Sequence, residues 1–321
     1  MFRFLSTRLW NGALVMIGVS FISFLLFNYI GDPVSNLLGE RATVEQRQTM
    51  QVALGLDQPL LLRFIRYIGL AMQGEFGISY RNIEPVGQLL LSRVPATLEL
   101  AFCAALLALG LGIPMGVYAG IKRDAWGAQL LQVVSLVGIS VPSFLTGIIL
   151  ILIFSVELNW LPAFGRGEVV KLGAWSTGLL TIAGLKSLIM PAVTLALFQL
   201  TLFMRLVRSE MLEVLRTDYI KFARARGIVD RSIYFHHALK NTLIPVITVA
   251  GLQMGALIAF SIITETVFQW PGLGLLIIQA INFSDIPVIA AYLMLIALLF
   301  VSINTVVDLL YFWVDPRVRI A

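Results

Sequence analysis

The sequence predicts an all-α integral membrane protein with six transmembrane helices. The chain has 321 residues, of which 59% are hydrophobic and 13% are charged, and its mean hydropathy is +0.90. An ordinary soluble domain has about 45–50% apolar and about 25% charged residues. Six segments approach the roughly 20 apolar residues that a helix needs to cross a hydrocarbon core. They are residues 9–30, 97–120, 130–156, 188–207, 243–265 and 287–311.

The first apolar segment follows Arg3 and Arg8, an arrangement that secretory signal peptides share. The run from Leu9 to Ile30 is longer than the apolar stretch of a signal peptide, which has about 7–15 residues. No cleavage site of small residues follows the run. We therefore interpret residues 1–30 as an uncleaved N-terminal transmembrane helix.

Residues 31–96 form a predicted extracytoplasmic insertion between the first two spans. Apolar residues recur in it at helical spacing, at Leu60, Leu61, Phe64, Ile65 and Ile68. This pattern indicates a small amphipathic helix that lies against the membrane surface or against a neighbouring element. The other predicted parts are a five-helix core over 97–311, which includes a polar loop at 208–242, and a tail at 312–321.

The distribution of Lys and Arg predicts the orientation. Eight Lys and Arg residues lie from Arg205 to Lys240, and Arg3 and Arg8 precede the first span, whereas the segment 266–286 has none. Short cytoplasmic segments of membrane proteins carry an excess of Lys and Arg. We therefore expect both termini and the polar loop to be cytoplasmic.

The sequence predicts no catalytic residues, no metal site and no cofactor. Cys103 is the only cysteine, and the adjacent His236 and His237 would point in different directions on a helix, so they make a poor metal site. No Gly-x-x-x-x-Gly-Lys-Ser/Thr loop for cradling phosphates is present. We expect neither an enzyme nor a nucleic-acid partner; the partner that the composition requires is a lipid bilayer.

Two spans carry small residues at four-residue spacing, which lets helix backbones approach closely in lipid. They are Gly112, Gly116 and Gly120 in the second span and Gly251, Gly255 and Ala259 in the fifth. These stripes pack either within the chain or across an interface with a second membrane subunit. Prolines within the spans predict kinks at Pro114, Pro142 and Pro191.

Acidic residues are predicted toward the span ends, where water reaches them: Glu99, Glu157, Glu265 and Asp308. Transporters coupled to protons or sodium usually have acidic groups near mid-membrane, so this placement argues against such coupling. Uncharged polar residues are candidates to line a translocation pathway. They are Ser135, Ser140 and Ser143 in the third span and Gln253 and Ser261 in the fifth. Each is alternatively an interhelical hydrogen bonder.

The polar loop contains a short predicted helix from Asp218 to Gly227. One face of this helix carries Tyr219, Phe222, Ala223 and Arg226. Asp218 suits the N-cap or first turn, and Gly227 suits the left-handed position after the C-cap. A helix of about nine residues is marginal alone in water, so it requires a partner surface. The alternative is a helix that lies on anionic lipid.

The polar loop also carries two linked motifs, Asp218-Tyr-x5-Ala-Arg-Gly227 and Ala238-Leu-x-Asn241-x3-Pro245. They resemble the Glu-Ala-Ala loop of binding-protein-dependent ABC importer permeases, although its core stands here as Phe222-Ala223-Arg224. Further motifs, in order, are similar to the B-type permease subunit of the dipeptide/oligopeptide/nickel branch. These are Gly31-Asp32-Pro33, Leu54–Pro59, Gly74–Ser79, Arg93–Leu100, Glu265–Gly274 and Asp315-Pro-Arg317.

The resemblance implies a type I ABC importer permease-like core, preceded by an extra span, in a bacterial cytoplasmic (inner) membrane. It also implies three kinds of partner: a C-type permease subunit, two cytoplasmic ABC ATPases and an extracytoplasmic solute-binding protein. Residues implied to couple the spans to an ATPase are Asp218, Tyr219, Phe222, Ala223, Arg224, Gly227 and Pro245. Residues implied to form an external loop or gate are Glu265, Trp270, Pro271, Gly272 and Gly274.

The function that the resemblance implies is import of short peptides, with ATP hydrolysed by the partner subunits. Members of the branch also import nickel complexes, glutathione and opine-like solutes. A stand-alone secondary transporter is the alternative of a different class.

Overall fold

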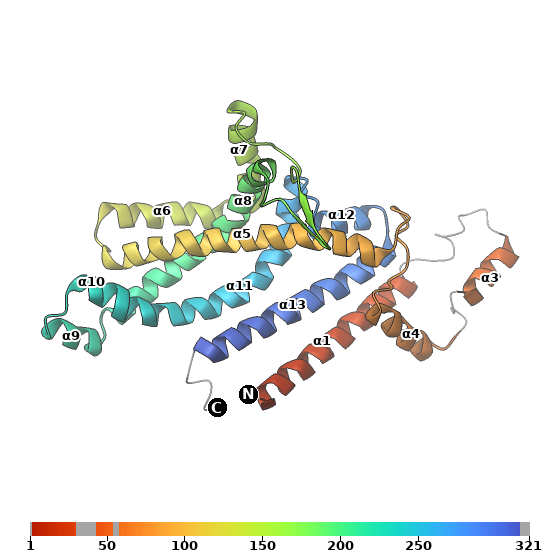
Figure 1. The fold of residues 1–321 in the computed structure, drawn as a ribbon, viewed down its shortest axis with the longest axis horizontal. Helices are drawn as coiled ribbons and strands as arrows, with labels where there is room; N and C mark the ends of the chain where they lie inside the picture. The colour runs from red at the N-terminus through yellow and green to blue at the C-terminus, as the bar shows by residue number, and fades with distance from the viewer. Residues whose placement is uncertain (1, 30–42, 54–57, 315–321) are drawn as a thin grey trace. The chain divides into compact units, whose positions relative to one another are not determined.

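The computed structural model describes residues 2–29, 43–53 and 58–314. It divides into two compact units, Met1–Pro95 with Gly272–Ser302 and Ala96–Pro271 with Ile303–Ala321. Figure 1 shows the helices and strands of both units. Three sequence predictions lie wholly or partly outside the described residues: the motif Gly31-Asp32-Pro33, the start of Leu54–Pro59, and the tail with Asp315-Pro-Arg317.

Within the described residues, five helices are long and apolar enough to cross a membrane: Ser6–Phe27, Val86–Ile121, Ile182–Val214, Asp230–Val267 and Ile286–Leu309. A bent pair, Trp126–Ser140 with Ser143–Glu157, makes a sixth span when it is counted as one. The two halves of the pair meet at 104°, so the predicted span over 130–156 is sharply bent, in agreement with the kink predicted at Pro142. Pro142 stands at the break, as expected of a residue that has no N–H to donate and restricts the residue before it.

Among its described residues, the first unit contains α1 (Phe2–Tyr29), α3 (Val44–Ala53), α4 (Leu60–Met72) and α12 (Leu273–Asn282), with parts of α5 (Val86–Ile121) and α13 (Ile286–Val314). The α4 helix is the amphipathic helix that the spacing of its apolar residues predicts. It packs on α1, because the ring of Phe64 lies edge-on to Phe21 at 5.5 Å and the ring of Tyr67 lies 5.8 Å from Phe24. The sequence left open whether this helix lies against the membrane surface or against a neighbouring element, and in the structure it lies against α1.

A buried carboxylate fixes the loop that follows α4. Asp285, just before α13, is 2% exposed. It accepts hydrogen bonds from the hydroxyl of Ser79 at 2.5 Å and from the backbone N–H of Tyr80 at 3.2 Å. The Gly74–Ser79 motif thus ends at the residue that ties this loop to the start of α13.

The second unit contains most of the long helices. Its elements are the rest of α5, α6 (Trp126–Ser140), α7 (Ser143–Leu150), the π-helix η1 (Ile151–Glu157), β1 (Val170–Leu172), β2 (Trp175–Thr177), α8 (Ile182–Val214), α9 (Asp218–Ala225), α10 (Asp230–Ser232), the π-helix η2 (Ile233–Ala238), α11 (Leu239–Val267) and the end of α13. The two strands pair antiparallel. Figure 1 shows α5, α8 and α11 side by side, with α9 and α10 where α8 ends and α11 begins. Many side chains of α8 are buried, so α8 forms the core of this unit.

The glycine stripe of α5 packs within the chain. A Cβ at Gly112 would lie 3.0 Å from the Leu200 carbonyl oxygen, and one at Gly116 would lie 2.6 Å from the Met204 carbonyl oxygen. Both oxygens belong to the backbone of α8. The backbones of α5 and α8 can lie this close only because glycine carries a hydrogen atom in place of a side chain. For the second span, the intrachain alternative is therefore confirmed.

Replacing Gly116 with alanine is expected to lower the free energy of unfolding by about 1–3 kcal/mol, because the added methyl overpacks the contact with α8. Gly110→Ala is the matched control, since a Cβ at Gly110 meets nothing within 4 Å and alanine favours a helix over glycine. Thermal unfolding of both variants in detergent measures the difference. Equal stability of the two variants would contradict the close packing of α5 on α8.

Candidate functional site

The short helix α9 (Asp218–Ala225) has well-defined ends. Asp218 lies in the first turn, as predicted, and its carboxylate accepts a hydrogen bond from Lys221 Nζ at 2.8 Å. The Lys221 ammonium holds the pKa of Asp218 below its ordinary value, so the stabilisation from this exposed pair is present at neutral pH and is lost only as the solution becomes acidic. At the other end Gly227 has φ +77°, the left-handed conformation predicted for it.

A Schellman motif terminates α9. The N–H of Gly227 donates to the Arg224 carbonyl at 2.9 Å, and the N–H of Ile228 donates to the Ala223 carbonyl at 3.3 Å. These two bonds satisfy carbonyls that a helix C-terminus otherwise leaves unpaired. The helix therefore ends at a fixed position although it is short.

One side of α9 is buried and another is exposed. Ile220 and Ala223 are 0% and 6% exposed, whereas Tyr219 and Phe222 are 42% and 64% exposed. The prediction that Ala223 shares a presented face with Tyr219 and Phe222 is wrong, because Ala223 packs against its own chain. The sequence pattern also missed Ile220, whose burial beside Ala223 decides how α9 is rotated.

Tyr219 connects α9 to the start of α11. Its hydroxyl accepts a hydrogen bond from Asn241 Nδ2 at 2.6 Å and donates to the His237 carbonyl at 3.5 Å. Pro245 lies one turn after Asn241, inside α11. The structure thus brings Tyr219 close to the second of the two sequence motifs.

Two arginines of the α9 segment make weaker contacts. Arg224 Nε lies 3.8 Å from Asp230 Oδ1, in an exposed ion pair. The guanidinium of Arg226 lies 5.8 Å from the centre of the Phe222 ring. Phe222 is therefore a large, exposed aromatic side chain with a cation beside it.

A second group of buried residues surrounds an ion pair between α5 and the segment before α8. Glu99 and Arg166 pair through their side chains, which are 5% and 7% exposed. Arg166 also donates to the carbonyl of Ser176 at 2.7 Å, and Glu99 accepts from the N–H of Gly178 at 3.3 Å. The prediction that water reaches Glu99 at a span end is wrong, since another part of the chain covers it.

Two residues of the predicted external loop belong to the same group. Trp270 is 1% exposed, its indole N–H donates to the Ala96 carbonyl at 2.9 Å, and Arg166 lies 5.8 Å from the centre of its ring. Glu265 is 0% exposed and accepts a hydrogen bond from the Thr97 hydroxyl at 2.6 Å. Neither side chain is presented outward, and the predicted access of water to Glu265 is wrong as well.

The remainder of the predicted external loop is mostly helical. Gly272, which directly follows Pro271, is the N-cap of α12, and Gly274 lies in the first turn of that helix. The left-handed residue of this connection is Gln269, with φ +48°. Neither of the two glycines has a positive φ, so neither acts as a left-handed turn residue here.

A pocket of about 210 Å³ lies at the break between α6 and α7. Ser143 lines it, together with Thr194 and Gln199 of α8. The sequence reasoning missed these last two residues, although a Gln in an otherwise apolar span is a recognisable signal. The amide of Gln199 donates to the Gln253 side chain at 3.3 Å, which connects Gln253 to this polar group.

The other predicted pathway residues lie elsewhere. The hydroxyl of Ser135 donates to the Gln132 carbonyl at 2.7 Å, and that of Ser140 donates to the Leu136 carbonyl at 2.8 Å. Ser261 is 0% exposed and donates to the Ile258 carbonyl at 2.8 Å. Each of these bonds lies within the residue's own helix, so none of them is the interhelical hydrogen bond expected as the alternative.

The sequence matches a family model along most of its length. The model for binding-protein-dependent transport system inner membrane components matches residues 112–320, and a model for the N-terminal part of such membrane components matches residues 1–101. The chain belongs to this family. It is therefore a multi-pass inner-membrane permease, and the alternative of a stand-alone secondary transporter is set aside.

Relatives of this permease match from end to end. It is 40% identical to the di/tripeptide transport system permease protein DppB of Pseudomonas aeruginosa (strain UCBPP-PA14), over 99% of each chain. It is 39% identical to the probable D,D-dipeptide transport system permease protein DdpB of Escherichia coli (strain K12), over 98% of this chain and 96% of the relative. It is 37% identical to the dipeptide transport system permease protein DppB of the same strain, over 99% of each chain.

A solved structure supports the fold. The MetNI methionine ABC transporter, in an inward-facing conformation, superposes with a TM-score of 0.56 at 19% identity, over 71% of this chain and 96% of that chain. The permease therefore has the ABC importer permease fold, as the sequence predicts.

Breaking the Glu99–Arg166 pair is expected to lower the free energy of unfolding by about 3–5 kcal/mol in either single variant, Glu99→Gln or Arg166→Met, because each leaves a buried charge unpaired. The double variant removes both charges and is expected to recover most of that loss. Thermal unfolding of the four proteins gives the coupling energy. Additive effects of the two substitutions would contradict a direct buried pair.

Proposed function

We propose that this chain is the permease subunit through which an ATP-driven importer moves short peptides across the inner membrane. The observation that carries the proposal is the end-to-end similarity to permeases named for dipeptides, di/tripeptides and D,D-dipeptides. The chain itself is the membrane component, so ATP is hydrolysed by partner subunits. Nickel complexes, glutathione and opine-like solutes are the competing substrates that an experiment has to exclude.

The proposed partners are a C-type permease subunit, two cytoplasmic ABC ATPases and an extracytoplasmic solute-binding protein. The family description supports a system that depends on a binding protein. Both termini and the 208–242 loop are proposed to be cytoplasmic, which agrees with the Lys and Arg residues of that loop. The opposite surface, which includes the 158–181 segment, would then receive the solute-binding protein.

The α9 helix is the proposed contact with an ATPase. Phe222 and Tyr219 are exposed on it, and large aromatic side chains are typical anchors in protein interfaces. The bond between Asn241 and the Tyr219 hydroxyl joins this surface to α11, so a displacement of α9 would act on a membrane-spanning helix. This role does not extend to Ala223, whose burial makes it a packing residue.

The substrate is tested with the assembled complex in proteoliposomes. ATP hydrolysis is measured with the solute-binding protein and one solute at a time: a dipeptide, a longer peptide, a nickel chelate or glutathione. Peptides alone are expected to stimulate hydrolysis and to accumulate inside the vesicles. Stimulation by the nickel chelate or glutathione without a response to either peptide would refute the peptide assignment.

Phe222→Ala is expected to weaken ATPase binding roughly 30-fold, the loss of a hot-spot aromatic of about 2 kcal/mol, while the protein still inserts and folds. Phe164→Ala is the matched control, because Phe164 is 60% exposed against 64% for Phe222 and lies in the 158–181 segment. Co-purification of the ATPases with each variant gives the comparison. Retention of the ATPases by Phe222→Ala at the level of the control would refute the contact.

A further inference from the structure

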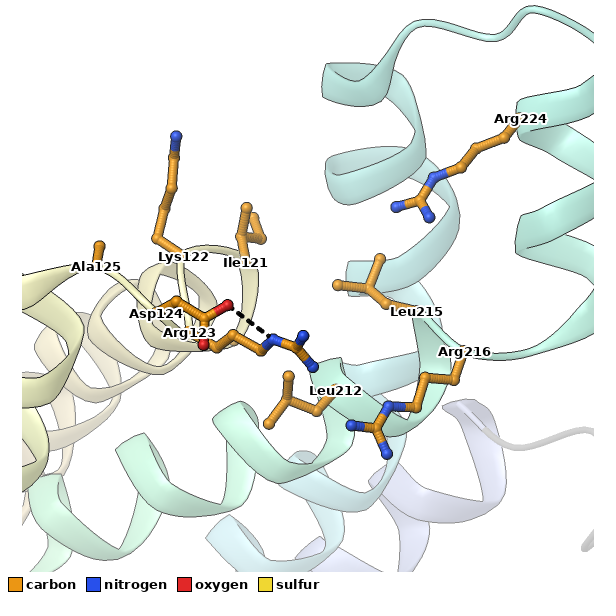
Figure 2. Close-up of a pocket in the computed structure, with 10 residues that line it drawn as sticks. Ile121, Lys122, Arg123, Asp124, Ala125, Leu212, Leu215, Arg216 and Arg224 are labelled. Atoms are coloured by element: carbon orange, nitrogen blue, oxygen red, sulfur yellow. Dashed lines mark hydrogen bonds and ion pairs between the residues drawn. The ribbon is translucent and has the colours of Figure 1, made fainter.

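A basic pocket lies where two long helices end. Its volume is about 410 Å³, and it is bounded by the turn between α5 and α6, the end of α8, and α9. Four cations and one carboxylate line it: Lys122, Arg123, Arg216, Arg224 and Asp124. Figure 2 shows the guanidinium groups of Arg123, Arg216 and Arg224 extending toward one space from the turn, from the end of α8 and from α9.

The described residues neutralise only part of this charge. Arg123 pairs with Asp124 at 3.1 Å and Arg224 pairs with Asp230 at 3.8 Å, both in exposed pairs. Within the described ranges, the side chains of Lys122 and Arg216 have no ion pair or hydrogen bond. Glu213, the further acid beside this site, lines an adjoining hollow with Arg208 and Arg216.

The chemistry of the basic pocket suits a phosphate group. Guanidinium groups form paired hydrogen bonds with phosphate oxygens, and several of them around one space favour a compact anion. Beside the cations lie apolar side chains, namely Ile121, Leu212 and Leu215. The basic pocket therefore offers cations for a headgroup and an apolar wall for the chain attached to it.

Its position along the membrane helices points to a lipid. The apolar helix Val86–Ile121 ends at the basic pocket. The helix Ile182–Val214 reaches it through a charged last segment with Arg208, Glu210 and Glu213. The pocket therefore lies on the headgroup side of the hydrocarbon boundary. Trp126, at the start of α6, is 77% exposed, and tryptophan is enriched at that level. Clusters of Lys and Arg next to a span attract anionic lipid.

The surface of α9 separates the basic pocket from the proposed ATPase contact. Residues two apart on a helix point about 200° away from each other, so Arg224 lies on the other flank of α9 from Phe222. Ile220 and Ala223, both buried, lie between Arg224 and Tyr219 around the helix. An ATPase that binds Phe222 would therefore leave the basic pocket to a different ligand.

We propose that the basic pocket binds the phosphate headgroup of an anionic phospholipid. The site depends on the membrane placement that the family gives and not on the coupling role proposed for α9. Bound lipid would neutralise Arg123 and Arg216, and it would bridge the α5–α6 turn to the end of α8.

The test uses the delipidated full complex, with native mass spectrometry to measure the dissociation constants of phosphatidylglycerol and phosphatidylcholine. The double variant Arg123→Gln with Arg216→Gln is expected to weaken phosphatidylglycerol binding roughly 30-fold, because both guanidinium groups line the pocket and each cation beside an anionic headgroup contributes about fivefold. The matched control is Arg231→Gln with Lys240→Gln, which removes the same charge from exposed positions of the 208–242 loop and is expected to stay within about twofold of wild type.

Three results would overturn the proposal: equal phosphatidylglycerol affinity in the two double variants, equal affinity of the wild type for phosphatidylcholine, or binding of inorganic phosphate without binding of phosphatidylglycerol. Loss of the ATPases from Arg123→Gln with Arg216→Gln, at unchanged lipid affinity, would assign these cations to a protein partner instead. Phe222→Ala separates the two proposals, because it is expected to keep wild-type lipid affinity. If Phe222→Ala also retained the ATPases, the coupling role would fail and the lipid site would stand.

Discussion

The buried ion pair between Glu99 and Arg166 is the interaction on which the arrangement of the second unit depends. The strands β1 and β2 have three residues each, and so short a hairpin is not stable by itself. Arg166 holds it by donating to Ser176 in β2 while it pairs with Glu99 in α5. The same guanidinium lies over Trp270, which hydrogen-bonds to α5 at Ala96. One side chain therefore connects the hairpin, α5 and the residues that follow α11.

The α5 helix is consequently held at two separate levels by different forces. Near Glu99 the contact is ionic, with further hydrogen bonds from Arg166 to Ser176 and from Gly178 to Glu99. From Gly112 to Gly120 it is steric, because the absence of side chains lets α5 lie directly on the backbone and side chains of α8. A membrane offers little hydrophobic driving force between helices, so close packing and buried polar contacts have to determine their arrangement. The second unit uses both on one helix.

The sequence allowed correct prediction of features that depend on neighbours along the chain. The kink at Pro142, the amphipathic α4 helix and the left-handed Gly227 all follow from local stereochemistry. Predictions of features that depend on residues far away in the sequence are wrong or incomplete. Nothing next to Glu99 in the sequence indicates Arg166 as its partner, and nothing next to Glu265 indicates Thr97, so the sequence pattern predicts that water reaches both carboxylates. The sequence pattern predicts an outward-facing Ala223 for the same reason, because the burial of Ala223 depends on how α9 is rotated against residues elsewhere in the chain.

Pro245 divides α11 into a short first part and a long second part. Proline has no N–H, so Pro245 cannot make the helical hydrogen bond to the carbonyl of Asn241. Asn241 is also the residue whose side chain donates to the Tyr219 hydroxyl. The wider π-helical turn of Ile233–Ala238 directly precedes the start of α11, and α11 continues beyond Pro245 to Val267. The part of α11 from Pro245 to Val267 is about 33 Å long at 1.5 Å per residue. A tilt of about 5° at Pro245 would displace its far end by about 3 Å, as much as a hydrogen-bond length, and Glu265 with its bond to Thr97 lies at that end.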